Sequence, residues 1–167
     1  IADIKLNDID NTNSVAIDHL MDRMGFDSVI ANPFIGSIAL QDLVKRARKS
    51  EGGVIALVYM SHSGANEGYG LEVESGRKLY SIFLERASLA DADGIVVGAS
   101  NLQIIKEVSG RQLPIYSPGI GVQGGDAEAA ARAGADYMIV GRSILESKNP
   151  ASTALDFKER ISSAFRD

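Results

Sequence analysis

The chain has 167 residues, 45% of them hydrophobic, which is enough to build one domain with a substantial core. Its net charge of −5 and pI near 5.1 argue against nucleic acid or an anionic membrane as a partner. The absence of cysteine excludes disulfides, thiolate metal sites and cysteine nucleophiles, and we expect a cytoplasmic location. No apolar run reaches the length that spans a membrane.

Six strand-like segments rich in Ile, Val or Ala alternate with helical patterns along the chain. The predicted strands are Ile1–Leu6, Ser28–Ala31, Val54–Tyr59, Gly94–Val97, Pro114–Ser117 and Tyr137–Val140. This alternation predicts a parallel α/β sheet with right-handed crossovers.

Two apolar stripes predict helices between these strands. The first stripe has the spacing i, i+3, i+4, i+7 and consists of Ile17, Leu20, Met21 and Met24. The second lies on a helix predicted to begin near Glu74, and consists of Leu79, Ile82, Phe83 and Ala87. Methionine and aromatic residues at this spacing usually pack in a core, so we assign both stripes to packing.

The strand starts recur about every 27 residues, which favours a (β/α)8 TIM barrel. Eight units of that period need roughly 215–220 residues, close to the usual barrel size of about 250. We therefore expect residues 1–167 to form a single TIM-barrel domain that covers the last six βα units, with two units missing before Ile1. An open doubly wound sheet is the alternative, but its glycines should follow the first strand. Here charges follow the first strand, and glycines follow the last two.

The first predicted strand carries an array of charges. On a regular strand, Asp3 and Lys5 project to one face while Ile4 and Leu6 project to the other, and Asp8 follows the strand end. Two carboxylates around a lysine can keep the ammonium protonated and aim it at a reacting atom. The plainer interpretation is a solvated face with a surface salt bridge.

Glycines after the last two strands predict a phosphate site. Four glycines in the loop 118–126 allow close backbone approach to an anion, and Gly141-Arg142-Ser143 opens a short helix after the sixth strand. The plainer interpretation is tight turns and a surface cation. Ser61 follows the third strand, where it could form a hydrogen bond to a ligand. We predict no metal site, because no cluster of His, Asp or Glu has suitable spacing.

Together these residues resemble orotidine 5′-monophosphate decarboxylases of the compact microbial type. Four matches occur in the order found in that family: Asp3-x-Lys5-x-x-Asp8-Ile9-x-x-Thr12, then Met60-Ser61-His62, then Ser117-Pro118-Gly119-x-Gly121-x-Gln123-Gly124-Gly125-Asp126, then Val140-Gly141-Arg142-Ser143-Ile144. The first motif also occurs in sugar-phosphate decarboxylases and hexulose-phosphate synthases. The second and third are more specific to the orotidine branch.

The resemblance implies a lyase, a carboxy-lyase that converts orotidine 5′-monophosphate to uridine 5′-monophosphate (UMP) in pyrimidine biosynthesis without a cofactor. Lys5 would then be the proton donor to C6 of the pyrimidine, and Asp3 would lie next to the departing carboxylate. Asp8, Ile9 and Thr12 would reach into the neighbouring subunit's site, which implies a homodimer.

The resemblance also assigns the substrate-binding residues. Ser61 would read the pyrimidine edge, and Gln123, Gly141 and Arg142 would hold the phosphate. A loop would close over the ligand, and it consists of Pro118, Gly119, Ile120, Gly121, Val122, Gln123, Gly124 and Gly125.

Some features depart from the family pattern. Ser63 and Asp10 stand where many relatives have proline, and the family's first aspartate and first lysine have no counterpart in this sequence. Two alternatives stay open: a magnesium-dependent sugar-phosphate decarboxylase or synthase, and a non-catalytic binder of a phosphate ligand. Intact Asp3, Lys5 and Asp8 favour a catalyst over such a binder.

Overall fold

The computed structural model describes residues 1–165, which fall into two compact units. Unit 1 comprises Ile1–Val58 and Asn66–Ile95, and unit 2 comprises Tyr59–Ala65 and the chain from Val96 onward. The six strands follow one another in the sheet in chain order.

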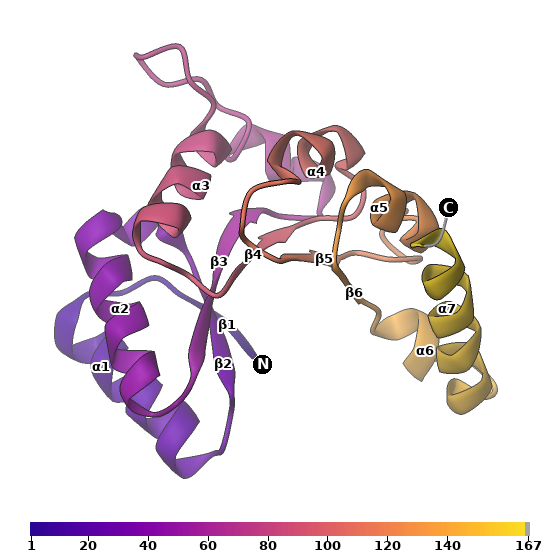
Figure 1. The fold of residues 1–167 in the computed structure, drawn as a ribbon, viewed down its shortest axis with the longest axis horizontal. Helices are drawn as coiled ribbons and strands as arrows, with labels where there is room; N and C mark the ends of the chain where they lie inside the picture. Colours follow the sequence, from indigo (N-terminus) through magenta and orange to yellow (C-terminus); the bar gives the residue numbers. More distant parts are fainter. Residues whose placement is uncertain (166–167) are drawn as a thin grey trace. The chain divides into compact units, whose positions relative to one another are not determined.

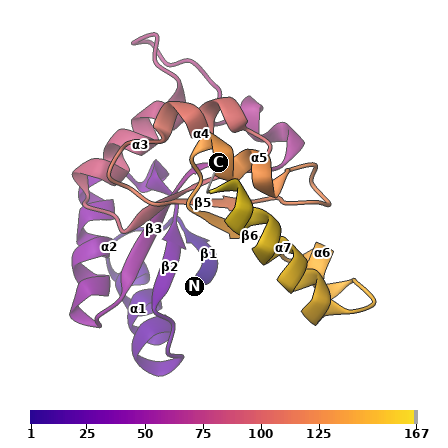
Figure 2. The same cartoon turned by 45° about the vertical axis from the view of Figure 1, so that its right-hand side comes forward.

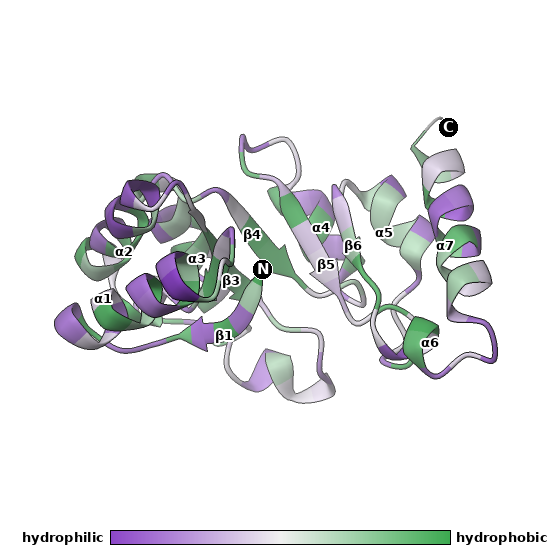
Figure 3. Cartoon of the chain, turned by 90° about the horizontal axis from the view of Figure 1, so that it is seen from below, coloured by the Kyte–Doolittle hydropathy of each residue, from purple (hydrophilic) through white to green (hydrophobic). Residues whose placement is uncertain are grey.

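The strands are β1 (Ala2–Leu6), β2 (Ser28–Ala31), β3 (Gly53–Tyr59), β4 (Gly94–Val97), β5 (Ile115–Pro118) and β6 (Tyr137–Ile139). Each lies within one residue of its predicted bounds. β1 pairs with β2, β2 with β3, and β5 with β6, all in parallel, as the alternation of strands and helices predicts. β4 is buried along its whole length and is coloured as hydrophobic in Figure 3.

Unit 1 contains the helices α1 (Asp10–Asp18), α2 (Ser37–Lys49) and α3 (Leu79–Leu89). A π-helical segment (His19–Arg23) continues α1, and a short 3-10 turn (Pro33–Ile35) precedes α2. α1 and α2 lie side by side in Figures 1 and 2, and the guanidinium of Arg46 makes two hydrogen bonds to the carboxylate of Asp18. The core cluster of this unit includes Ile17, Met21, Val29, Ala31, Leu40, Leu43, Val44, Ala47 and Val54.

Two details of the predicted helices are wrong. Met24 is 57% exposed, because the wider π-helical turn before it rotates this position away from the stripe that buries Ile17 and Met21. α3 begins at Leu79 rather than near Glu74, because Glu72 and Lys78 form an antiparallel bridge around a turn in which Gly76 has φ +74°.

Unit 2 contains α4 (Leu102–Val108), α5 (Ala127–Ala133), α6 (Arg142–Leu145) and α7 (Pro150–Ala164), and a 3-10 segment (Ser63–Glu67) crosses its boundary. The Asp126 carboxylate caps α5 by accepting from the Ala129 N–H at 2.8 Å. α5 and α7 lie side by side in Figure 2, joined by two bonds from Arg160 to Glu128 of 2.5 and 2.9 Å.

In residues 1–165, no helix combines the length and the apolar character needed to cross a membrane.

Candidate active site

Lys5 lies in an irregular part of β1. Ala2 stands opposite Val29 and Leu6 opposite Ala31, so β1 advances four residues while β2 advances two. Lys5 itself has φ +49°, in the left-handed region that residues with a Cβ rarely adopt. The regular alternation predicted for this strand is therefore wrong: Ile4 is 48% exposed, whereas Leu6 packs against the core cluster.

Asp3 and Lys5 nevertheless meet. The Lys5 Nζ lies 2.6 Å from the Asp3 Oδ1, and the two side chains are 36% and 57% exposed, respectively. A charge-assisted bond of this length fixes the position of the ammonium group relative to the strand. The structure thus brings these two side chains into contact, and their role in a reaction stays a prediction.

Asp8 accepts hydrogen bonds from residues close to it in the chain and not from Lys5. Its Oδ1 accepts from the Ile9 N–H at 2.8 Å, and its backbone carbonyl accepts from the side-chain amide of the buried Asn13. Ile9 is 59% exposed and Thr12 is also exposed. Asp8, Ile9 and Thr12 thus lie on an exposed segment at the start of α1.

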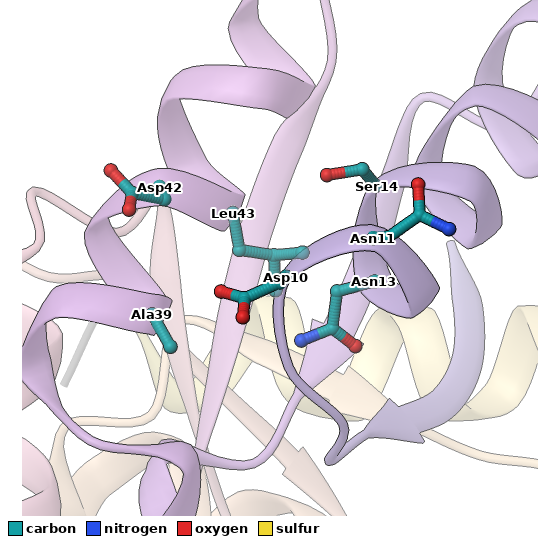
Figure 4. Close-up of a pocket in the computed structure, with 7 residues that line it drawn as sticks. All are labelled: Asp10, Asn11, Asn13, Ser14, Ala39, Asp42 and Leu43. Atoms are coloured by element: carbon teal, nitrogen blue, oxygen red, sulfur yellow. The ribbon is translucent and has the colours of Figure 1, made fainter.

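An open pocket of about 320 Å³ lies between α1 and α2 (Figure 4). Its walls are formed by Asp10, Asn11, Asn13, Ser14, Ala39, Asp42 and Leu43. None of the residues predicted for the active site lines this pocket.

In unit 2, Ser61 and Gln123 meet although 62 positions separate them. The Ser61 hydroxyl donates to the Gln123 Oε1 at 2.7 Å. Gly119, with φ +90°, lies directly against this pair: a Cβ there would be 2.6 Å from the Ser61 Cβ and 2.8 Å from the Gln123 Oε1. Only glycine fits this backbone and this space, so Gly119 lets the two side chains meet.

The rest of the glycine loop is folded on itself. The N–H groups of Gly121 and Gly124 donate to the carbonyls of Gly125 and Gly121 at 2.8 and 2.7 Å, and the Gly125 N–H donates to the Gly119 carbonyl at 3.0 Å. Three of the four glycine amides are therefore occupied within the loop. This differs from the expectation that the loop turns several of these N–H groups toward one anion. Ile120 is buried, Pro118 is half-buried, and Val122 and Gln123 are exposed.

The glycine loop adjoins the start of α6, as a shared phosphate site requires. The Ser143 hydroxyl donates to the Ile120 carbonyl at 3.4 Å, and a Cβ at Gly121 would collide with that hydroxyl. Gly141 precedes α6, and Arg142, its first residue, is exposed. Both glycine motifs thus lie together in unit 2.

Sequence reasoning missed the turn that follows β4. Gly98 donates its N–H to the Tyr59 carbonyl, Ala99 donates to the Pro118 carbonyl, and the Asn101 side chain donates to the Met60 carbonyl. This turn matches none of the family motifs quoted above. The sequence feature that could have identified this turn is its position directly after a parallel strand, because ligand-binding residues lie at strand ends in α/β folds.

Within residues 1–165, no three His, Asp or Glu side chains come together to hold a metal ion.

Comparison with known proteins identifies the family. The sequence model of the Orotidine 5'-phosphate decarboxylase / HUMPS family matches residues 1–157. The chain belongs to this family. Its members include the orotidine 5'-phosphate decarboxylase of Methanococcoides burtonii, which is 37% identical over 157 residues, 92% of this chain and 69% of that protein. The Thermoplasma acidophilum protein of the same name is 37% identical over 165 residues, 98% of this chain and 72% of that protein.

Solved structures of orotidine 5'-monophosphate decarboxylases agree with this assignment. The protein from Methanocaldococcus jannaschii, complexed with the inhibitor BMP, matches with a TM-score of 0.84 and 30% identity, over 96% of this chain and 72% of that one. The Sulfolobus solfataricus protein matches with a TM-score of 0.80 and 29% identity, over 97% and 72%. The predicted family, the TIM-barrel fold class and the assignment as a carboxy-lyase are confirmed.

Proposed function

We propose that this chain decarboxylates orotidine 5′-monophosphate to UMP, a step of pyrimidine biosynthesis, without a metal or organic cofactor. Family membership supports the reaction class. The observation that carries the mechanism is the ion pair between Lys5 and Asp3, with its 2.6 Å bond.

Lys5 is the proton donor in this mechanism. The bond between C6 and the carboxylate breaks, carbon dioxide leaves, and the electron pair stays on C6 in the plane of the ring. The Lys5 ammonium gives a proton to C6, which yields UMP, and solvent returns a proton to the amine. Enzymes lower barriers by about 8–23 kcal/mol, and this reaction belongs in the upper part of that range because the ring offers no electron sink. A fixed ammonium stabilises the carbanion with little reorganisation.

The two carboxylates have distinct roles. Asp3, which accepts a hydrogen bond from the Lys5 ammonium, lies next to the departing carboxylate and orients the amine. Asp8, Ile9 and Thr12 act in the site of the neighbouring subunit of a homodimer. Their exposure at the start of α1 supports this role.

Residues of unit 2 bind the nucleotide. Ser61 reads the pyrimidine edge, and Gln123, Gly141 and Arg142 hold the phosphate. Residues 118–125 close over the bound nucleotide, opening their internal hydrogen bonds so that Gly119, Gly121, Gly124 and Gly125 approach it. The phosphate is remote from C6, so its binding energy drives closure and positioning rather than chemistry directly.

We further propose that the chain forms one TIM-barrel domain in which these six βα units act with two more. The relatives compared above are longer than this chain, which covers 69% and 72% of them. Both end strands of the sheet also expose apolar side chains, with Ile4 48% exposed on β1 and Tyr137 54% exposed on β6. The mass of the intact polypeptide tests this: about 50–60 additional residues are expected from the usual barrel size, and a mass of 17.7 kDa contradicts it.

The reaction is tested with substrate labelled at the carboxyl carbon. The intact protein should release labelled carbon dioxide and produce an equal amount of UMP, at the same rate with and without a metal chelator. Failure to release label would contradict the proposed reaction. Loss of activity in chelator would contradict the cofactor-free mechanism and favour the magnesium-dependent sugar-phosphate branch.

A further inference from the structure

The turn after β4, residues 98–101, lies between the two loops to which the nucleotide contacts are assigned. On one side, the Gly98 N–H donates to the Tyr59 carbonyl at 2.9 Å. On the other, the Ala99 N–H donates to the Pro118 carbonyl at 2.9 Å. This turn, in which Gly98 and Ala99 are buried, therefore sets the separation of the strand ends that carry Ser61 and the glycine loop.

Two side chains of this turn hold the backbone on both sides of the Ser61 Cα. The Asn101 Nδ2 donates to the Met60 carbonyl at 3.2 Å and to the Gly98 carbonyl at 3.4 Å. The Ser100 hydroxyl donates to the Ser61 carbonyl at 3.4 Å. The Ser61 hydroxyl remains available for its bond to Gln123.

The backbone of Ser61 also rests on Gly98. A Cβ at Gly98 would lie 2.5 Å from the Ser61 Cα and 2.8 Å from its nitrogen. Such contact leaves Ser61 little freedom to move toward the turn. Asn101 then restricts movement away from it.

The Asn101 side chain makes these bonds instead of capping α4. It is the N-cap residue of α4, and asparagine at that position normally accepts from the N–H groups of the first helical turn. Here the side chain makes no capping bond. The helix loses a favourable interaction, and the Met60 carbonyl gains one.

We propose that Asn101 is a positioning residue that fixes Ser61 for recognition of the pyrimidine edge. The proposal rests on the function proposed above, because it takes Ser61 as the group that reads the pyrimidine. Asn101 itself need not touch the nucleotide. It acts through the Met60 carbonyl and so sets where the Ser61 hydroxyl lies.

The variant Asn101→Asp separates positioning from stability. Aspartate is nearly the same size and is a good N-cap, favoured by the helix dipole, so the unfolding midpoint should stay within about 3 °C of the parent's. It cannot donate to the Met60 carbonyl. Gln103→Glu is the matched control, because it makes the same amide-to-acid change at an exposed position of α4.

The readout is affinity for two ligands measured by calorimetry. Asn101→Asp should bind UMP about tenfold more weakly, the effect of losing one well-placed bond, while ribose 5-phosphate, which lacks the pyrimidine, keeps its affinity within twofold. Gln103→Glu should match the parent for both. Unchanged UMP affinity in Asn101→Asp, or an equal loss for both ligands, overturns the proposal.

A double-mutant cycle checks that the effect passes through Ser61. In a Ser61→Ala background, adding Asn101→Asp should change UMP affinity by less than twofold, because the group being positioned is gone. A full tenfold further loss would overturn the proposal.

Hydrogen exchange in the ligand-free protein gives a test that needs no nucleotide. Asn101→Asp should speed amide exchange in residues 59–65 at least fivefold, and Gln103→Glu should leave it unchanged. Equal exchange in all three proteins overturns the proposal. A parent that binds UMP but releases no carbon dioxide from orotidine monophosphate would refute the proposed function and leave these comparisons intact.

Discussion

Lys5 combines a strained backbone with a short ion pair. A left-handed conformation costs a residue with a Cβ about 1–2 kcal/mol, and φ at Lys5 is +49°. Such strain persists where the surrounding structure enforces it, and it is concentrated at functional positions. Here β1 is held by pairing with β2 at both Ala2 and Leu6, and the irregular stretch between them contains Asp3 and Lys5.

Substitution of Arg142 tests its proposed role in binding the phosphate. Arg142→Ala should raise KM for orotidine monophosphate about 10- to 100-fold, because a charge-assisted bond contributes about 1.5–3 kcal/mol. Steady-state kinetics measures this. Arg132→Ala, which removes another exposed cation of unit 2, should leave KM unchanged. Equal KM values for the two variants would remove Arg142 from the phosphate site.

Individual site residues could be predicted where a motif was present. The glycine loop lies against Ser143, as expected from the place of both motifs after neighbouring strands, and Asp3 and Lys5 are in contact although the alternation expected for their strand is broken. The left-handed Lys5 could not be predicted, since a register shift depends on how β1 meets β2. Asn101 was missed because its bond to the Met60 carbonyl joins positions 41 residues apart.

At the scale of elements, the loop 118–125 depends on glycine for two separate reasons. Gly119 has a positive φ, and it also lies against Ser61 and Gln123. Gly110 has a similar φ, +82°, but nothing lies within 4 Å of a Cβ there. Comparing alanine substitutions at Gly119 and Gly110 therefore separates the effect of backbone strain, present at both, from that of steric crowding, present only at Gly119.

Gly119→Ala should therefore do more damage than Gly110→Ala. Both variants should lose a similar amount of stability, about 1 kcal/mol, from the backbone conformation. Only Gly119→Ala should also lower kcat/KM, by at least about tenfold, because its methyl group displaces the Ser61–Gln123 bond. Thermal unfolding and steady-state kinetics on both proteins check this. Matching kcat/KM values would mean that the close contact has no functional consequence.

The contact between α5 and α7 should make stability depend on pH. The guanidinium of Arg160 lowers the pKa of Glu128 below its usual 4.5, chiefly through a hydrogen bond to the carboxylate. Because the folded-state pKa is the lower one, this stabilisation is complete above pH 4.5 and is lost as pH falls through the folded-state value.

Glu128→Gln should accordingly lower the unfolding midpoint by about 2–4 °C at pH 7. The difference from the parent should shrink as pH is lowered below 4.5. Calorimetry across this range measures it, with Glu159→Gln, an exposed glutamate of α7, as control. A difference that is the same at pH 7 and pH 3 would contradict the assigned cause.

Element types were easier to predict than element ends. All six strands were predicted within one residue because each is a short segment rich in Ile, Val or Ala between helical patterns. The start of α3 was misplaced because the apolar stripe that begins at Leu79 does not by itself show where the helix starts. Backbone bonds such as that from the Val73 N–H to the Arg77 carbonyl at 2.9 Å close a hairpin directly before it.

For the whole molecule, the proposal that Asp8, Ile9 and Thr12 act in the neighbouring subunit's site predicts how much activity a mixture of two inactive variants regains. Lys5→Ala and Asp8→Ala should each be nearly inactive alone. Mixing them in equal amounts should restore about a quarter of parental activity, because half of randomly formed dimers are hybrids and each hybrid has one intact site of two. Native mass spectrometry should verify subunit exchange before the assay. If hybrids form without regained activity, each subunit works with its own Asp8.

The fold class was predictable from the alternation and period of the strands, and the structural matches confirm it. What the sequence could not supply is the state of the loop 118–125. Its amides are bonded internally here, and a pattern of glycines does not distinguish a loop closed on itself from one wrapped around an anion.

The central claim is that the Lys5 ammonium protonates C6. It is tested most directly by Lys5→Ala, with Lys106→Ala, another exposed lysine, as control. Turnover of orotidine monophosphate by Lys5→Ala should fall by about a thousandfold or more. Its affinity for UMP should stay within about threefold of the parent's, because the residues proposed to bind the nucleotide are unchanged. Turnover within tenfold of the parent would contradict the account.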